Sequence, residues 1–342
     1  MNEKLNWGIL TTGWIARKFA TDLPQSRTGR LVAVGARRLP DAEKFARDFG
    51  GVRAHGSYEG LLADPAVQAV YVGTPHPWHR EWAIKAAAAG KHVLCEKPLT
   101  LDRADTERVI AAARAHQVLL MEAYMYRCHP QTRKIVELVR AGAIGEPRLI
   151  RAAFSVARDF DPEHRMFKRE LGGGAILDLG CYPVSFARLI AGAALGRPFA
   201  DPVEFHATGR LHPQARTDEY AAAVARFPGD VIAELSCGST VVHDMAARIH
   251  GTRGWLDVPV PFTPGLEGRD EQIVLHRAGA APEELAIPGR GVGLYAHEAD
   301  AVAEALARGA REVPEMSWAD TLGNMAVLDA WRAAAGVTYD AT

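Results

Sequence analysis

The sequence predicts an α/β protein with two domains, and three observations support this. The chain has 342 residues, which is more than one ordinary hydrophobic core holds. As far as about residue 124, short apolar runs alternate with helical stretches, as in a doubly wound parallel sheet. Beyond it, strand-like runs follow one another with few helices between them, which indicates an α+β domain with a large, mostly antiparallel open sheet. We therefore divide the chain into residues 1–124 and 125–342.

Charge and composition exclude several classes of protein. A formal net charge of -1 gives no general attraction to nucleic acid or to an anionic membrane. No apolar run approaches the roughly 20 residues that span a bilayer, and a strand that opens at Leu5 leaves no room for a signal peptide. Widely spread cysteines are typical of reduced thiols. We expect a cytoplasmic protein without nucleic-acid or membrane partners. The cysteines are Cys95, Cys128, Cys181 and Cys237.

The chain opens with a strand–turn–helix–strand unit, whose strands are predicted at Leu5–Leu10 and Leu31–Ala36. In such units a dinucleotide pyrophosphate lies on the helix N-terminus, after a turn of the form G-x-G-x-x-G/A. Thr11 stands at the first glycine position, Gly13 keeps the second, and Ala16 occupies the third. An unliganded strand–turn–helix is the alternative. The cofactor-binding residues predicted here are Thr11, Thr12, Gly13, Trp14 and Ile15.

The end of the second strand bears on which dinucleotide binds. An acidic residue there bonds the ribose 2′-hydroxyl of NAD, whereas an arginine accommodates the 2′-phosphate of NADP. This chain has Arg37 and Arg38 at that point, and Asp41 is the expected cap of the next helix. Because planar guanidinium groups suit bidentate phosphate binding, we expect NADP, with NAD as the alternative. Two solvated loop arginines are the other interpretation.

Further elements follow in the same alternating order through the first domain. The predicted helices are Asp41–Phe49, Tyr58–Ala63, Glu81–Ala89 and Asp102–Ala115, the last capped by Thr100. The predicted strands are Val52–Ala54, Val67–Val72, Val93–Cys95 and Val118–Glu122.

The second domain is predicted to contain seven strands and three helices. The predicted strands are Arg148–Arg158, Val203–Gly209, Tyr220–Phe227, Val231–Cys237, Ala246–Gly251, Gly254–Val258 and Gln272–His276. The predicted helices are Pro130–Arg140, Tyr295–Ala307 and Trp318–Ala335. One face of this sheet must be covered by helices or by another subunit, so we expect a homodimer or higher homo-oligomer.

One strand of the first domain stops abruptly at Glu96-Lys97-Pro98. Pro98 blocks further ladder bonding and keeps Lys97 out of helical geometry. Lys97 is thereby placed at the carboxyl end of a parallel strand, where ligands bind in open α/β sheets. A solvated loop lysine is the alternative.

Together these motifs resemble the glucose–fructose oxidoreductase/inositol dehydrogenase (Gfo/Idh/MocA) family. The resemblance rests on the nucleotide unit, on Glu96-Lys97-Pro98 and on the glycine-rich segment Leu171–Pro183, in that order along the chain. Met121–Arg127 and the same segment are most similar to the branch that contains dimeric dihydrodiol dehydrogenase and NADP-dependent D-xylose dehydrogenase.

The resemblance implies roles for individual residues. Lys97 matches the active-site lysine, Asp178 the first aspartate of a D-x-G-x-H/Y motif, and Tyr182 the position that is histidine or tyrosine in different branches. Ser185 replaces the last aspartate of that motif, so any role of a second carboxylate is lost. The resemblance places further cofactor contacts at Thr74, Pro75, His76, His79, Glu96 and Lys97.

Hydride transfer at a carbinol needs a proton acceptor and a group that stabilises the developing oxyanion. We interpret Tyr182 as the general acid/base and Lys97 as the cation that lowers the tyrosine pKa and anchors substrate oxygen. Asp178 orients Lys97 or bonds a substrate hydroxyl, or has a structural role. For Arg165, a solvated loop is the preferred interpretation. His76 and His79 form only a pair, so no metal is expected.

The predicted function is NADP-dependent oxidation or reduction of a small polyhydroxylated molecule. The substrate implied by the resemblance is an aldose such as D-xylose, oxidised at C1, or a trans-dihydrodiol. Two alternatives remain: a non-catalytic dinucleotide-binding regulatory protein, and a glycosidase or epimerase that recycles a tightly bound NAD.

Overall fold

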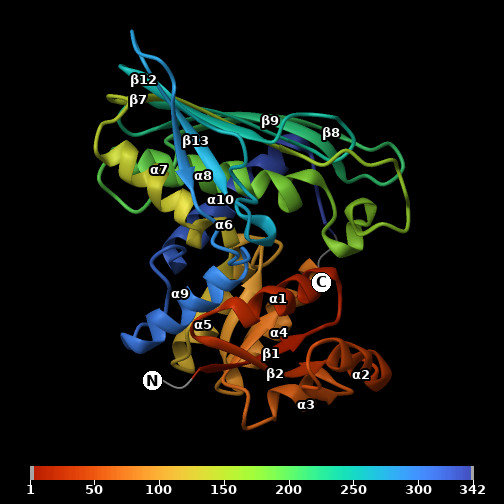
Figure 1. Ribbon diagram of the computed structural model, residues 1–342. Coiled ribbons are helices and arrows are strands. Elements are labelled where there is room, and N and C mark those ends of the chain that lie inside the picture. The colour runs from red at the N-terminus through yellow and green to blue at the C-terminus, as the bar shows by residue number, and fades with distance from the viewer. Residues whose placement is uncertain (1–3, 340–342) are drawn as a thin grey trace.

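The computed structural model describes residues 4–339. The first of its two sheets has six strands, all parallel (Figure 1). The strand order β3-β2-β1-β4-β5-β6 is that of a doubly wound dinucleotide fold, whose topological switch point lies between β1 and β4. The strands are β1 (Leu5–Leu10), β2 (Gly29–Gly35), β3 (Arg53–His55), β4 (Ala69–Val72), β5 (His92–Glu96) and β6 (Leu120–Ala123).

The predicted doubly wound parallel sheet is therefore confirmed, and its helices lie close to the predicted ranges. They are α1 (Trp14–Asp22), α2 (Leu39–Asp48), α3 (Tyr58–Leu62), α4 (His79–Ala88) and α5 (Arg103–Ala115). Two predicted caps are wrong. Helix α2 begins after Arg38, so Asp41 lies inside its first turn, and α5 is capped by the Asp102 carboxylate, which accepts the Asp105 N–H at 2.8 Å.

The second sheet has eight strands in the order β14-β13-β12-β11-β7-β10-β9-β8. All its pairings are antiparallel except that of β7 with β10, which confirms a mostly antiparallel sheet. The strands are β7 (Pro147–Ser155), β8 (Glu204–Leu211), β9 (Asp218–Phe227), β10 (Val231–Gly238), β11 (Ala246–Gly251), β12 (Gly254–Val258), β13 (Glu271–Arg277) and β14 (Glu283–Ile287).

Among the described residues, helices cover only the inner face of this sheet. Figure 1 shows α7, α8 and α10 below the sheet, on the side of the parallel domain, and nothing above it. The helices of this half are α6 (Met125–Cys128), α7 (Pro130–Arg140), α8 (Cys181–Ala194), α9 (Ala296–Ala307) and α10 (Trp318–Ala335). The sequence analysis missed α6, α8 and β14.

Helix α8 is the buried centre of the second domain. The segment Arg169–Ala194 is the one helical stretch of the described chain that is long and apolar enough to cross a membrane, with a hydropathy of 1.3. The expectation that no apolar run reaches such a length is therefore wrong. The apolar window is completely buried in the protein, as in the core helix of a globular domain, so it is weak evidence for a membrane span.

A buried charged network ties α6, α8 and α10 together. Asp320 accepts hydrogen bonds from Arg127 at 2.5 Å and from Arg188, and all three side chains are at most 2% exposed. The Ser185 hydroxyl accepts from Tyr126 at 2.8 Å and from Arg127 at 3.1 Å. The serine that replaces the motif's last aspartate is thus part of the scaffold behind the motif.

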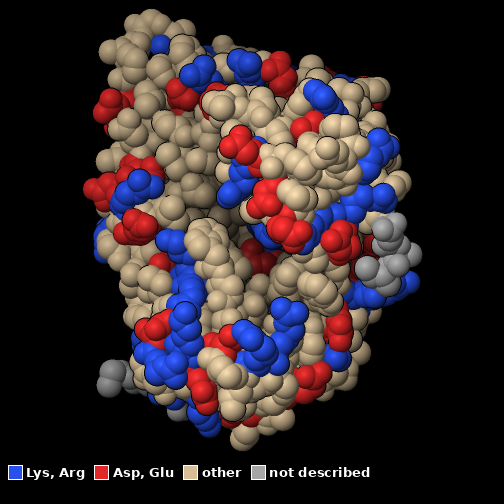
Figure 2. Space-filling model, turned by 90° about the vertical axis from the view of Figure 1, so that its right-hand side faces the viewer, with Lys and Arg blue, Asp and Glu red and all other residues tan. Residues whose placement is uncertain are grey.

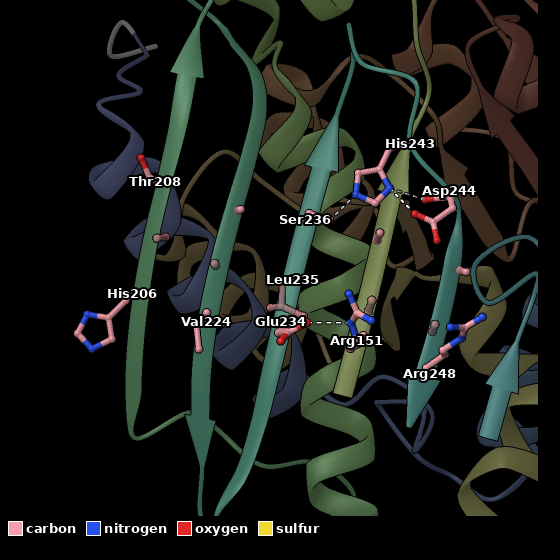
Figure 3. Close-up of a pocket in the computed structure, with 17 residues that line it drawn as sticks. Arg151, His206, Thr208, Val224, Glu234, Leu235, Ser236, His243, Asp244 and Arg248 are labelled. Carbon is pink, nitrogen blue, oxygen red and sulfur yellow. Dashed lines mark hydrogen bonds and ion pairs between the residues drawn. The ribbon is translucent and has the colours of Figure 1, made fainter. Parts of the chain in front are cut away.

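The outer face of the large sheet is exposed and forms a shallow recess of about 580 Å³. Figure 3 shows its side chains standing on the strands, among them the Arg151–Glu234 ion pair at 2.8 Å and His243 between Ser236 and Asp244. Apolar side chains are exposed on the same strands. They are Tyr220, Val224, Ile232 and Trp255.

The turn after β1 holds a strained residue. Thr11, at the position where the dinucleotide turn usually has glycine, adopts a φ of +89°. A β-branched side chain is unfavourable there, at a cost of about 1–3 kcal/mol. The Thr11 N–H is held by the Gly35 carbonyl oxygen at 2.9 Å, so the pairing of β1 and β2 imposes this conformation.

We predict that Thr11→Gly stabilises the protein by about 1 kcal/mol, because glycine relieves the strain but loses about 0.4–1 kcal/mol more backbone entropy on folding. Urea unfolding followed by circular dichroism measures the change. Thr12→Gly is the matched control, since Thr12 is not among the described residues with positive φ, and it should destabilise. Equal effects of the two variants would show that Thr11 is not strained.

Candidate active site

A cleft lies at the carboxyl ends of the parallel strands and is made of two adjoining cavities that share Thr11, Thr74 and Pro75. Figure 2 shows this side of the molecule, where the surface is hollowed between its upper and lower parts. The larger cavity, of about 1050 Å³, is lined by α2, α3 and the ends of β1 and β2. The smaller, of about 460 Å³, is lined by residues of both domains. Both lie in the size range of ligand pockets.

Every residue predicted to contact cofactor or substrate lines one of these two cavities. The larger cavity contains Thr11, Thr12, Arg37, Arg38, Thr74 and Pro75. The smaller contains Thr11, Gly13, Trp14, Ile15, Thr74, Pro75, His76, His79, Glu96, Lys97, Asp178 and Tyr182.

Helix α1 presents its N-terminus to the smaller cavity. Its first residue follows Gly13, no side chain caps it, and a Cβ on Gly13 would meet only the Thr11 hydroxyl, at 3.9 Å. The Thr74 hydroxyl oxygen, which is buried, has no hydrogen-bond partner within residues 4–339. Free backbone N–H groups, an open approach and an unused hydroxyl fit a dinucleotide pyrophosphate.

The two arginines after β2 differ in their surroundings. Arg38 is paired with Asp41 through two hydrogen bonds, of 2.7 Å and 2.8 Å. Arg37 has no side-chain partner among the described residues and lines the larger cavity. Its guanidinium group is therefore the one that is free to bind a 2′-phosphate.

Lys97 is fixed by the motif that ends β5. The Lys97–Pro98 peptide bond is cis, and the ammonium group donates to the Asp178 carbonyl oxygen at 2.8 Å and to its carboxylate at 3.3 Å. Burial is the largest influence on the pKa of Lys97 and lowers it, but Asp178, Cys181 and Glu96 together outweigh burial and raise the pKa above 10.5. Since an ammonium group has three donors, one N–H remains for a substrate oxygen.

Asp178 and Tyr182 lie on one face of a continuous helical segment. Asp178 is in a π-helical turn, Ile176–Gly180, which runs directly into α8, and residues four apart in a helix are neighbours. Arg165 Nη2 donates to both Asp178 carboxylate oxygens at 2.9 Å. Burial raises the pKa of Asp178, but Lys97 and Arg165 hold it well below its usual range.

Tyr182 is 4% exposed and lies against Lys97 in an unexpected way. The Lys97 ammonium is 4.8 Å from the centre of the Tyr182 ring, over its face, and the hydroxyl donates to the Met125 sulfur at 3.4 Å. Burial raises the pKa of Tyr182 well above 10. The expected lowering of this pKa by lysine is therefore wrong, and the phenol is protonated at neutral pH.

Glu96 and His79 form hydrogen bonds with the backbone on either side of Lys97. Glu96 accepts hydrogen bonds from the Tyr71 hydroxyl and from the Lys97 backbone N–H, and burial raises its pKa. The ring nitrogens of His79 lie 2.8 Å from the Pro98 carbonyl oxygen and 2.6 Å from that of Thr74. These contacts fix the strand ends on both sides of Lys97.

The sequence analysis missed several residues of the smaller cavity. Arg165 was interpreted as part of a solvated loop, yet it contacts Asp178 directly. No local pattern marks the others, because they come from segments far apart in the sequence. They are Met125, Phe154, Leu179, Thr263 and Tyr295.

Comparisons with known proteins agree with this architecture. Residues 5–124 match the family model described as an oxidoreductase family with an NAD-binding Rossmann fold, and residues 132–257 match the GFO/IDH/MocA C-terminal domain. The trans-1,2-dihydrobenzene-1,2-diol dehydrogenase of Mus musculus is 34% identical over 344 residues, or 98% of both chains.

Solved structures with the same architecture include a 3-ketoreductase and an aldose-aldose oxidoreductase. A 3-ketoreductase from Actinomadura kijaniata, in complex with NADP and TDP-benzene, is 31% identical, with a TM-score of 0.85 over 97% of this chain and 98% of its own. An aldose-aldose oxidoreductase from Caulobacter crescentus, complexed with glycerol, is 25% identical, with a TM-score of 0.85 over 98% of both chains. The chain described here belongs to the Gfo/Idh/MocA family of oxidoreductases.

Proposed function

We propose that this protein is an NADP-dependent oxidoreductase that acts on a hydroxyl or carbonyl group of a sugar or diol. One observation carries the proposal: the free N–H of Lys97 and the phenol of Tyr182 line the same cavity, next to the uncapped N-terminus of α1. The names of relatives support the substrate class, since they include a dihydrodiol dehydrogenase and a 3-ketoreductase bound to NADP.

The bound nicotinamide supplies the hydride for reduction and accepts it in oxidation. In reduction, Lys97 donates a hydrogen bond to the substrate carbonyl oxygen and stabilises the alkoxide as it forms. The Tyr182 hydroxyl gives its proton to that oxygen, and water restores the proton. In oxidation, the proton of the substrate hydroxyl passes to the Tyr182 phenolate. The hydride leaves from the substrate carbon that bears this hydroxyl. Asp178 holds Lys97 in place for both directions.

The raised pKa of Tyr182 favours reduction near neutral pH. A protonated phenol is the required acid for reduction, whereas oxidation requires the phenolate, which is scarce when burial raises the pKa well above 10. We expect kcat/KM for oxidation to rise with pH throughout the neutral and mildly alkaline range. For reduction, kcat/KM should be independent of pH over the same range.

Tyr182→Phe should lower turnover by about 100- to 10,000-fold, the usual contribution of a general acid or base, and leave NADPH binding intact. NADPH absorbance measures turnover, and NADPH fluorescence measures binding. Tyr126→Phe is the matched control, because this buried phenol binds Ser185 and is not among the cavity-lining residues described. Near-full activity of Tyr182→Phe, or a pH profile unchanged by it, would refute the assignment.

The same assays separate the alternative functions. A regulatory protein would bind NADPH and turn over no sugar, diol or dicarbonyl. An enzyme that recycles its cofactor would be purified with stoichiometric dinucleotide and would need no added NADP.

The preference for NADP is proposed to depend on Arg37. Loss of a charge-assisted contact of about 1.5–3 kcal/mol corresponds to a 10- to 150-fold change, so Arg37→Met should raise the KM for NADP by about that factor and leave the KM for NAD unchanged. Arg38→Met is the control, and its effect should be smaller because Asp41 already holds Arg38. A larger effect of the control would assign the phosphate to Arg38.

We also propose that two copies associate through the outer face of the large sheet, whose exposed side chains include Val224 and Ile232. Apolar side chains on an uncovered sheet face favour an interface. Light scattering should show a dimer at micromolar concentration, and Val224→Asp with Ile232→Asp should give a folded monomer. A wild-type monomer would contradict the proposal.

A further inference from the structure

We propose that Arg165 makes the substrate site selective for a carboxylate, so that the substrate class is sugar acids rather than neutral sugars or diols. The inference rests on the proposed function, since it names the substrate of that same site. It follows from how Arg165 is held, from the donors that it leaves free and from the charges that line the cavity.

Arg165 is held over the cavity by the glycine-rich segment. It lies on a short 3-10 helix, Arg165–Phe167, whose carbonyl groups pack against Gly173. A Cβ on Gly173 would lie 2.7 Å from the Arg165 oxygen and 2.6 Å from the Met166 oxygen, and the Gly174 N–H donates to Met166 at 2.9 Å. This close packing fixes the backbone of Arg165 beside Asp178.

The arginine has unused donors. Only Nη2 contacts Asp178, and within residues 4–339 neither Nε nor Nη1 has a protein partner. The side chain is 46% exposed, while Asp178 is 8% exposed. A guanidinium group that is fixed at one nitrogen and open at the other two matches the planar, two-oxygen geometry of a carboxylate.

The charges in the cavity also favour an anion. Its lining contains two cations, Lys97 and Arg165, and both contact a single carboxylate, Asp178. Glu96 is the remaining carboxyl group in the lining, and it accepts hydrogen bonds from the Tyr71 hydroxyl and from the Lys97 backbone N–H. The two cations thus share one carboxylate, Asp178, and the Arg165 nitrogens that it does not contact, Nε and Nη1, are left for a substrate carboxylate.

The positions of the two cations also divide their roles. The Lys97 side chain is 12% exposed and lies against Tyr182, where the reacting oxygen must be. Arg165 contacts both carboxylate oxygens of Asp178, and its side chain is 46% exposed. We therefore assign the reacting oxygen to Lys97 and Tyr182 and the substrate carboxylate to Arg165, as when a uronate reacts at C1 and is bound through its C6 carboxylate.

The test compares substrates that differ only in this group: D-glucuronate with D-glucose, and D-galacturonate with D-galactose. The wild type should prefer the acid of each pair by about 10- to 100-fold in kcat/KM, the range expected for a charge-assisted contact. Arg165→Met should remove that preference mainly through KM, and Arg165→Lys should restore part of it. Arg158→Met is the matched control, because Arg158 is an exposed arginine of the same loop, and it should keep the preference.

Three results would overturn the inference. One is equal or better use of the neutral sugars by the wild type. The other is an equal loss for both members of a pair in Arg165→Met, which would mean that Arg165 only positions Asp178. A preference for D-glucose 6-phosphate over D-glucuronate would also overturn it, in favour of a phosphate.

Binding is measured separately from turnover, by the change in protein fluorescence when each sugar is added to the NADPH complex. Selective binding of the acids without turnover would support the carboxylate site and count against the proposed oxidoreductase function. Turnover of neutral sugars alone would support the oxidoreductase function and count against the carboxylate site.

Discussion

The arrangement of the active site depends on one buried carboxylate. The Asp178 carboxylate joins Lys97 of the parallel sheet to Arg165 of the second half of the chain, with hydrogen bonds of 3.3 Å to the lysine and 2.9 Å to the arginine. A buried charge is costly unless it is paired, so both cations must stay in place while Asp178 is ionised. The carboxylate thereby links the strand end that carries Lys97 to the loop that carries Arg165, and both line the smaller cavity.

The sequence predicted the parts of this arrangement that depend on local patterns. Alternating apolar runs gave the two sheets, and Pro98 located Lys97 at a strand end. The contact between Asp178 and Arg165 could not be predicted, because it depends on the packing of a polar loop against Gly173. Helix α8 was missed because it is buried on all sides, so it has no polar face opposite an apolar one to recognise.

The position of Ser185 shows how the scaffold differs from the family motif. The serine hydroxyl accepts hydrogen bonds from Tyr126 and Arg127, and Arg127 finds its counter-charge in Asp320 of α10. An arginine buried in this way requires a carboxylate nearby, and here the carboxylate comes from another helix. Among the described residues that line the smaller cavity, Asp178 is therefore the one aspartate.

Burial rather than charge sets the properties of Tyr182. The tyrosine was expected to become acidic beside Lys97, but the ammonium lies over the ring face, where it contacts π electrons instead of the hydroxyl oxygen. A cation over the ring does little to stabilise a phenolate, while desolvation strongly disfavours it. A neutral phenol and a charged ammonium therefore coexist at neutral pH, and the proposed reduction needs this combination to protonate the carbonyl oxygen while the carbonyl carbon accepts hydride.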